Sequence, residues 1–360
     1  MTIFKTLSAD DRVSTKTLLH EAIPITASIV SGTYVDGSGN PTNIQNYTHG
    51  MFQSVYDYPY LSSSANHIFD ITFGTSADSA LVVTNQASKK DNIYNQMAQV
   101  LMGYDKDGVI QKFDSDGDLT TTSDKMNDVV FLSFSRLLVK DEIKKGSFQL
   151  DLGLSGSYTT PMLKIASIKD TGADTSYRIN SPAGEYGILY ITNSVGAPLN
   201  GITGSTQQKC GLIYYQAGIA VLTSSVFMGT SQGGFLSASV NFYDASTTFT
   251  GSIVAQEISG CADGLRHRMA NVQFNNTIEL NSTVYFCRAK HNEFNYSSNP
   301  TYLSGSQIRV KQNTTDVPIS YVTSIGLYSA DNTLLAVGKF SEPIRKDSNI
   351  ELTFRARLDY

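Results

Sequence analysis

The sequence has no tryptophan, only three cysteines in 360 residues, and few charged side chains. Its charged fraction of 16% is below the roughly one quarter that is typical of soluble domains. No apolar run approaches the length of a membrane span, so we expect no membrane partner. Residues 1–11 show no basic segment followed by an apolar one, which predicts no secretory signal.

The cysteines, Cys210, Cys261 and Cys287, have no CxxC spacing, and their odd number makes a poor disulfide framework. We therefore expect buried thiols and folding in a reducing cytoplasm. The net charge is −5, and the nearest candidate for a basic patch is the short cluster Arg266-His267-Arg268. Nucleic-acid binding normally needs more clustered Lys and Arg, so we expect no nucleic-acid partner.

Alternation of apolar and polar residues is clearest near the C-terminus, and it predicts a half-buried strand over 350–358. Two strands are expected before it, Tyr321–Tyr328 and Leu334–Phe340, joined by a Ser-Ala-Asp-Asn turn as a hairpin. Pro343 is expected to end the second strand. The three strands together would form a C-terminal three-stranded meander. Further strands are expected at Val129–Phe134, Phe148–Leu152, Gly187–Thr192, Gly211–Tyr215, Ala217–Ser224 and Thr283–Ala289.

Few segments predict helices. Asn92–Met102 places apolar residues on one face, behind Asp91 as a possible cap and before Gly103. A second helix is expected over Ala262–Phe274, and a single turn over Lys140–Lys145. The fold class is therefore mainly β, with antiparallel sheets, long loops and few short helices.

We expect three consecutive regions along the chain. Residues 1–72 form an extended N-terminal arm and irregular region, 73–290 a central β-rich domain with two short helices, and 291–360 a C-terminal β attachment region. Segments without apolar periodicity bury too little area to order alone. We expect the arm, up to about Thr33, to order on another subunit, although it could also begin the chain's own core.

The segment Asp114-Ser-Asp-Gly-Asp118 resembles a ligand-binding motif more than any other part of the chain. Alternating carboxylates on a turn can present several oxygens to calcium, so Asp114, Asp116 and Asp118 form a weak candidate calcium site. The EF-hand pattern is broken, because Lys125 stands where its Glu should be. Asp-Gly pairs also simply make turns. We expect no metal and no cofactor.

Motifs for enzymatic chemistry are missing from the sequence. The five histidines show no HExxH spacing, and the stretch Gly229-Thr-Ser-Gln-Gly-Gly lacks the Lys of a P-loop and is not followed by a good helix. We therefore expect a protein that is not an enzyme.

The C-terminal residues resemble a known class of proteins. Asn292–Tyr302, the strand-like Gln307–Lys311, and then Ile-Gly-Leu-Tyr328, Leu-Leu-Ala-Val337 and Leu358-Asp-Tyr resemble virion structural proteins of contractile-tailed, cyanophage-like bacteriophages. The same region is similar to short attachment domains of tail-fibre and baseplate proteins. The resemblance covers about the last 70 residues, roughly a fifth of the chain.

This resemblance implies a virion protein of the baseplate or tail, made in the cytoplasm of a bacterial host. Its partners would be other phage structural proteins and copies of itself. An alternative is a virion-borne receptor-binding or carbohydrate-binding adhesin with a platform at Tyr56–Tyr60; a second is a neck or capsid-associated protein. A tail-borne hydrolase would need an acid pair or metal cluster that cannot be named. The expected interaction residues are Phe294, Tyr296, Tyr302, Tyr321, Leu327, Tyr328, Leu335 and Phe354.

Overall fold

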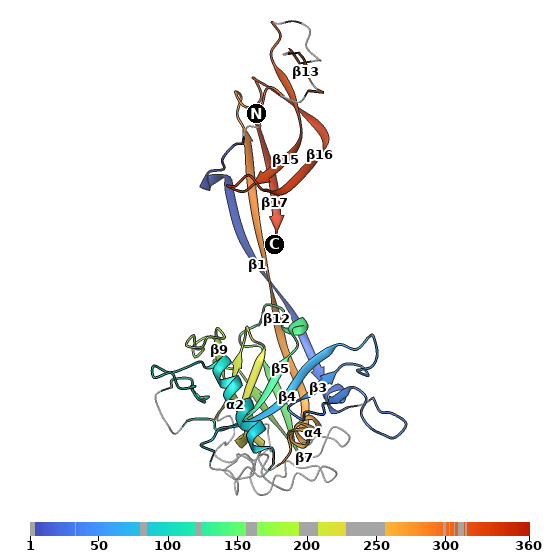
Figure 1. Cartoon of the computed structure of the whole chain (residues 1–360), viewed down its shortest axis with the longest axis vertical. Helices are drawn as coiled ribbons and strands as arrows, with labels where there is room; N and C mark the ends of the chain where they lie inside the picture. The colour runs from blue at the N-terminus through green and yellow to red at the C-terminus, as the bar shows by residue number, and fades with distance from the viewer. Residues whose placement is uncertain are drawn as a thin grey trace. The chain divides into compact units, whose positions relative to one another are not determined.

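A computed structural model describes most of the chain (Figure 1). The described residues are 4–32, 34–79, 85–119, 124–155, 164–193, 208–227, 256–297, 300–301, 303–305, 307–308, 313 and 315–360. The chain divides into two compact units. Unit 1 comprises residues 1–18 and 279–360, and unit 2 comprises residues 19–278. These units are not consecutive in sequence, whereas the three expected regions are.

Antiparallel strands dominate the described residues, which confirms the mainly β fold class. The large sheet follows the order β1-β12-β7-β8-β9-β10-β11-β5-β4-β3-β2. Its strands are β1 (Arg12–Thr26), β2 (Ile44–Asn46), β3 (Gln53–Tyr56), β4 (His67–Thr75), β5 (Asp128–Phe134), β7 (Gln149–Ser155), β8 (Lys164–Lys169), β9 (Tyr186–Asn193), β10 (Gln208–Tyr214), β11 (Ile219–Thr223) and β12 (Met269–Ala289).

Strand β5 lies in the interior of the sheet of unit 2, between β4 and β11. Its residues Val129–Leu132 are all buried. All four are apolar, because a strand covered on both faces needs apolar residues at consecutive positions. The expected strands at 129–134, 148–152, 187–192, 211–215 and 217–224 are confirmed within a few residues, and 283–289 is the end of the longer β12.

Helix α2 (Ala87–Leu101) packs against β4. A Cβ at Gly74 would come within 3.0 Å of Tyr94, so glycine permits this close approach. The predicted helix, Asn92–Met102, is confirmed in its C-terminal part, and Gly103 lies just beyond it with φ +79. Its start was wrong: the helix begins five residues earlier, and its N-cap is Gln86 rather than Asp91.

The second helix, α4 (Ile258–Arg268), ends earlier than expected. Residues from Met269 onward are extended in β12, where Val272 pairs with Leu150 of β7. Val272 and Phe274 are buried, and the pairing with β7 outweighs the weak helical spacing. The expected turn over 140–145 is also wrong, because helix α3 (Arg136–Val139) precedes a short strand, β6 (Glu142–Ile143).

Unit 1 contains the hairpin of β15 (Ile319–Tyr328) and β16 (Leu334–Asp347), which confirms the expected hairpin. Its third strand, β17 (Leu352–Asp359), does not extend this hairpin, so the expected meander is wrong. β17 instead pairs with β12 over eight positions, from Ser282↔Asp359 to Ala289↔Leu352. The remaining short elements are β13 (Leu303–Ser304), β14 (Gln307–Ile308), η1 (Ala9–Asp11), α1 (Ala27–Ser31) and η2 (Ser224–Phe227).

Pro343 does not end its strand, contrary to expectation, because β16 continues to Asp347. The ladder jumps from Val322↔Ile344 to Ser324↔Lys339, which leaves residues 340–343 outside the regular pairing. A β-bulge of this kind tolerates proline, since no N–H is needed there.

Residues 1–72 are more regular than expected, since they contain β1, β2, β3 and most of β4. β1 is 15 residues long, yet most of its side chains are exposed. An exposed strand needs no alternation, which explains why the sequence pattern missed it. Ile25 near the end of β1 and Val30 of α1 belong to the chain's own core. Phe4, Leu7 and Leu18 are exposed.

Candidate functional site

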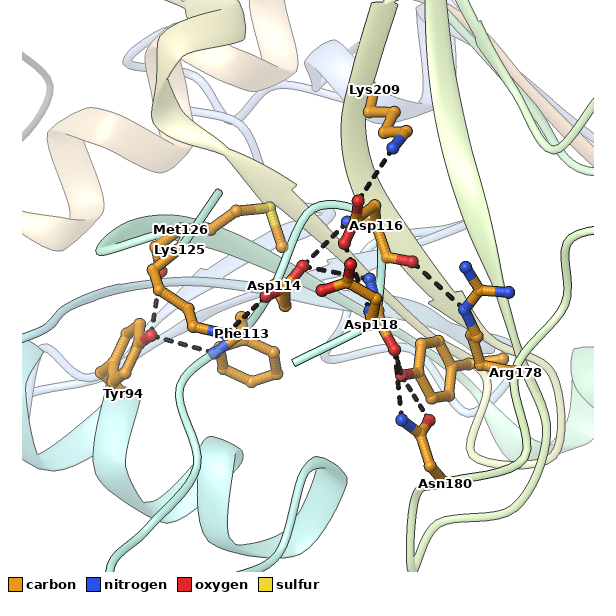
Figure 2. Close-up of polar contacts among 12 residues, drawn as sticks. Tyr94, Phe113, Asp114, Asp116, Asp118, Lys125, Met126, Arg178, Asn180 and Lys209 are labelled. Carbon is orange, nitrogen blue, oxygen red and sulfur yellow. Dashed lines mark hydrogen bonds and ion pairs between the residues drawn. The ribbon is translucent and has the colours of Figure 1, made fainter. Parts of the chain in front are cut away.

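The acidic segment 114–118 forms a loop between α2 and β5 of unit 2. Met126 N donates to Phe113 O at 2.9 Å, and Ser115 N donates to Asp124 O at 3.0 Å. The hydroxyl of Tyr94 on α2 accepts from Phe113 N at 3.2 Å and donates to Met126 O at 2.9 Å. The base of the loop is therefore fixed to the helix (Figure 2).

The structure brings the three predicted carboxylates together. One oxygen from each of Asp114, Asp116 and Asp118 lies within 4.8 Å of the others, and this is the only such group found among the described residues. Asp114 is buried, Asp116 is half-buried and Asp118 is exposed.

Protein donors already occupy the oxygens of Asp114. Its Oδ1 accepts from the backbone N–H groups of Asp116 and Gly117, both at 3.1 Å. Its Oδ2 accepts from Lys125 Nζ at 2.5 Å. Lysine thus supplies the positive charge that a buried carboxylate needs.

Asp116 is similarly paired, as Figure 2 shows. Its Oδ2 accepts from Lys209 Nζ at 3.0 Å, and its Oδ1 accepts from Asp118 N at 3.2 Å. Its hydrogen bond with Asp114 is the main cause that lowers the pKa of Asp116, and Lys209 adds to this. Burial, followed by the same hydrogen bond, raises the pKa of Asp114.

The segment that leads into β9 closes over the other side of the loop. Arg178 Nε donates to Asp116 O at 3.2 Å, and Asn180 Nδ2 donates to Gly117 O at 3.1 Å. Tyr186 donates its hydroxyl to Asn180 Oδ1 at 2.7 Å. Gly117 has φ +67, and a Cβ there would lie 2.8 Å from the Tyr186 oxygen. Only glycine fits this position without displacing the tyrosine.

These contacts make the loop a poor fit for calcium. Calcium takes six to eight oxygen ligands, and here the oxygens of Asp114 and Asp116 already accept hydrogen bonds. Two lysine ammonium groups occupy positions where a divalent cation would be repelled. The geometry instead suits a structural clamp that joins α2, β10 and the segment before β9.

The predicted interaction residues are gathered in unit 1, apart from Tyr302, which lies outside the described residues. Those that are described are all at least partly exposed. Two of them have aromatic neighbours within the unit: Tyr328 lies 4.7 Å from Phe4, and Phe354 lies 4.8 Å from Phe340, between ring centroids. The exposed or half-buried members are Phe294, Tyr296, Tyr321, Leu327, Tyr328, Leu335 and Phe354.

The alternative platform at Tyr56–Tyr60 also has ring contacts. Tyr56 and Tyr60 lie 6.2 Å apart, and Tyr58 meets Tyr34 at 5.1 Å. The Tyr56 hydroxyl donates to Gln45 Oε1, and burial raises the pKa of Tyr56 to about 12. Tyr58 is the more exposed ring. Part of this segment is therefore already engaged in contacts within the chain.

Comparisons with protein-family models, with curated proteins and with solved structures found no match for this chain. No helix within the described ranges is long and apolar enough to cross a membrane.

Proposed function

We propose that this chain is a bacteriophage virion structural protein, a baseplate or tail component that binds other phage structural proteins and copies of itself through unit 1. The phage assignment rests on the resemblance carried by residues 292–360. The assembly role rests on one structural observation, namely that the described residues of unit 1 form regular strands but no hydrophobic core of their own.

The described members of the buried hydrophobic cluster all lie in unit 2 and run from Ile25 to Phe274. In the described part of unit 1, the only buried apolar side chains are Ala289 and Ile319. Stable domains bury apolar faces between at least two layers of secondary structure. Unit 1 therefore has apolar surface that a partner would cover.

The ladder of β12 and β17 has one apolar face. Residues opposite each other in register share a face, which places Phe354 beside Cys287 and Leu358 beside Thr283. Along β17 the apolar residues at 352, 354, 356 and 358 are only half-buried. Such a face gains stability when a second surface removes it from water.

The hairpin β15–β16 adds large exposed apolar side chains. Tyr321, Leu334 and Val337 are exposed, and Leu335 is 67% exposed. Exposed large apolar side chains on a surface that is not covered within the chain favour protein interaction. Among the described strands, β17 pairs only with β12, and an open strand edge also favours pairing with another chain.

Sedimentation of the full-length protein and of two matched variants tests the assembly role. Leu335→Lys in unit 1 should shift the population toward monomer. Leu61→Lys should not, although Leu61 is 89% exposed, because it belongs to unit 2. Equal self-association of both variants and the native protein would contradict an assembly surface at Leu335.

Mass spectrometry of purified phage particles from the source of this sequence tests the virion role separately. The chain should be present at a fixed copy number relative to the other tail proteins. Recovery only from the lysate, and never from particles, would overturn the proposal.

A further inference from the structure

A cavity of about 340 Å³ lies in unit 2, on a different part of the protein from the acidic loop. Residues 46–52, the start of α2 and the start of α4 surround it. Its volume falls at the lower end of the 300–1,000 Å³ range of small-molecule sites. The lining residues that the argument uses are Asn46, Tyr47, Phe52, Gln86, Lys89 and Asp263.

Two fully buried side chains hold the floor of this cavity in place. Arg266 Nε donates to Gln53 Oε1 at 2.6 Å, and Arg266 also pairs with Asp263 Oδ1. Gln53 Nε2 donates to the same Asp263 oxygen at 2.9 Å and to Asn46 Oδ1 at 2.7 Å. Asp263 and Asn46 are therefore fixed from beneath, where the network is shielded from water.

This network leaves specific polar atoms for a ligand. Among the described residues, no protein donor reaches Asp263 Oδ2, so it remains a hydrogen-bond acceptor. Gln86 Oε1 accepts from Ile258 N at 3.0 Å, which leaves its NH₂ as a donor. Lys89 Nζ donates to His49 O at 2.8 Å and has further protons to donate.

The backbone around Gln86 is specialised. Gln86 has φ 54, a left-handed conformation that is rare outside glycine and asparagine. Gly50, opposite it, has φ +62, and a Cβ there would come within 3.3 Å of Gln86 Nε2. Left-handed non-glycine residues of this kind gather at ligand sites.

Tyr47 and Phe52 form part of the wall, and His49 supports Tyr47. Tyr47 stacks on His49 with centroids 5.1 Å apart and planes 7° apart, and Phe52 packs at 4.8 Å from Tyr47. Stacked rings form a rigid surface against which a flat apolar face of a ligand can pack.

We propose that this cavity binds a saccharide ring. Purely apolar ligands would leave the polar lining unpaired, which is costly. An anion would meet the carboxylates of Asp263 and Glu257, and a simple cation would meet Lys89. A sugar instead offers hydroxyl groups that both donate and accept, as the mixed lining requires, and C–H faces for the rings. The site is independent of the assembly role of unit 1.

Saturation-transfer NMR on the full-length protein tests this with four probes: glucose, galactose, mannose and N-acetylglucosamine. We expect transfer to at least one of them. Ser259→Tyr places a bulky ring in the cavity lining and should weaken that binding by about tenfold or more. Gly260→Tyr is the matched control, because Gly260 is the next residue on α4 and has no neighbour near its Cβ position.

Lys89→Ala is a second variant at an exposed lining position, and it should weaken binding about tenfold through the lost charged donor. Melting temperatures check that each variant is folded. Absence of transfer to all four sugars overturns the proposal. Undiminished transfer to a folded Ser259→Tyr or Lys89→Ala variant also overturns it.

Discussion

The ammonium nitrogen of Lys125 lies 2.5 Å from Oδ2 of Asp114, a carboxylate with no exposed surface. In a calcium loop, the metal ion would neutralise such a group. Here a lysine 11 residues further along the chain does so. The same lysine that breaks the EF-hand pattern in the sequence is thus part of the structure of the loop.

Metal removal should leave the stability of the protein unchanged, since lysines and backbone N–H groups already satisfy Asp114 and Asp116. Melting curves with a chelator and with added calcium should coincide within a few degrees. A rise of many degrees with calcium would show that the ion displaces Lys125.

Lys125→Met should destabilise the protein by about 3 kcal/mol, because it leaves a buried carboxylate without its partner. Lys106→Met is the matched control. Lys106 pairs with Asp107 at 2.7 Å, but both side chains are largely exposed, so we expect a change below about 0.5 kcal/mol. Urea unfolding of both variants measures the difference, and equal effects would contradict the clamp.

Gly117→Ala should cost more than Gly108→Ala, although both glycines follow an aspartate in a turn. Each has a left-handed φ, +67 and +80, so each variant carries backbone strain of about 1 kcal/mol or more. Only Gly117 also faces Tyr186 and Arg178 at 2.8–3.0 Å from the Cβ position, whereas Gly108 has no such neighbour. Thermal unfolding should therefore show a larger drop for Gly117→Ala; a larger drop for Gly108→Ala would contradict this geometry.

Asp170 should make unit 2 more stable at mildly acidic pH. Burial raises the pKa of Asp170 from its ordinary value of 3.8 to about 6. The folded state therefore binds a proton more readily than the unfolded state between these values, so this contribution grows as the pH falls from 7 to 5 and is lost as it rises again. The gain by pH 5 should be about 1 kcal/mol.

The measurement is the free energy of unfolding of native protein and Asp170→Asn at pH 5 and pH 7. The carboxylate accepts from Gly146 N at 2.6 Å and Phe148 N at 3.1 Å. Asparagine has only one side-chain oxygen and cannot accept both bonds as the carboxylate does. The Asp170→Asn variant should therefore be less stable than the native protein at either pH. The variant should also lack the gain in unfolding free energy that Asp170 contributes between pH 7 and pH 5. An identical pH profile for both proteins would refute the raised pKa of Asp170.

Local patterns in the sequence predicted the hairpin of unit 1 well. Its turn contains Asn332, which has φ 62, a conformation that asparagine tolerates. The partner of β17 could not be predicted in this way, because its ladder joins residues near 355 to residues near 286. Alternation shows that a strand has two faces, but it does not say which strand lies beside it.

The two candidate sites also differ in how far apart their residues lie in the sequence. Asp114, Asp116 and Asp118 are adjacent in sequence, so their spacing showed the loop. Lys209 reaches the loop from 93 residues away and could not be foreseen. The saccharide cavity combines three distant segments around Tyr47, Gln86 and Asp263, and its one sequence signal is the aromatic content of residues 47–52.

The division of the chain into units has a consequence for protein synthesis. Unit 2 is one continuous stretch, residues 19–278, whereas unit 1 combines residues 1–18 with residues 279–360. Domains fold as they emerge from the ribosome, so unit 2 can fold while residues 1–18 still wait for their partners in 279–360. During this interval Ser14 and Lys16 of β1 lack their contacts with Thr283 and Glu279. Completion of unit 1 thus follows the folding of unit 2, so its assembly surface forms only after residues 279–360 have been synthesised.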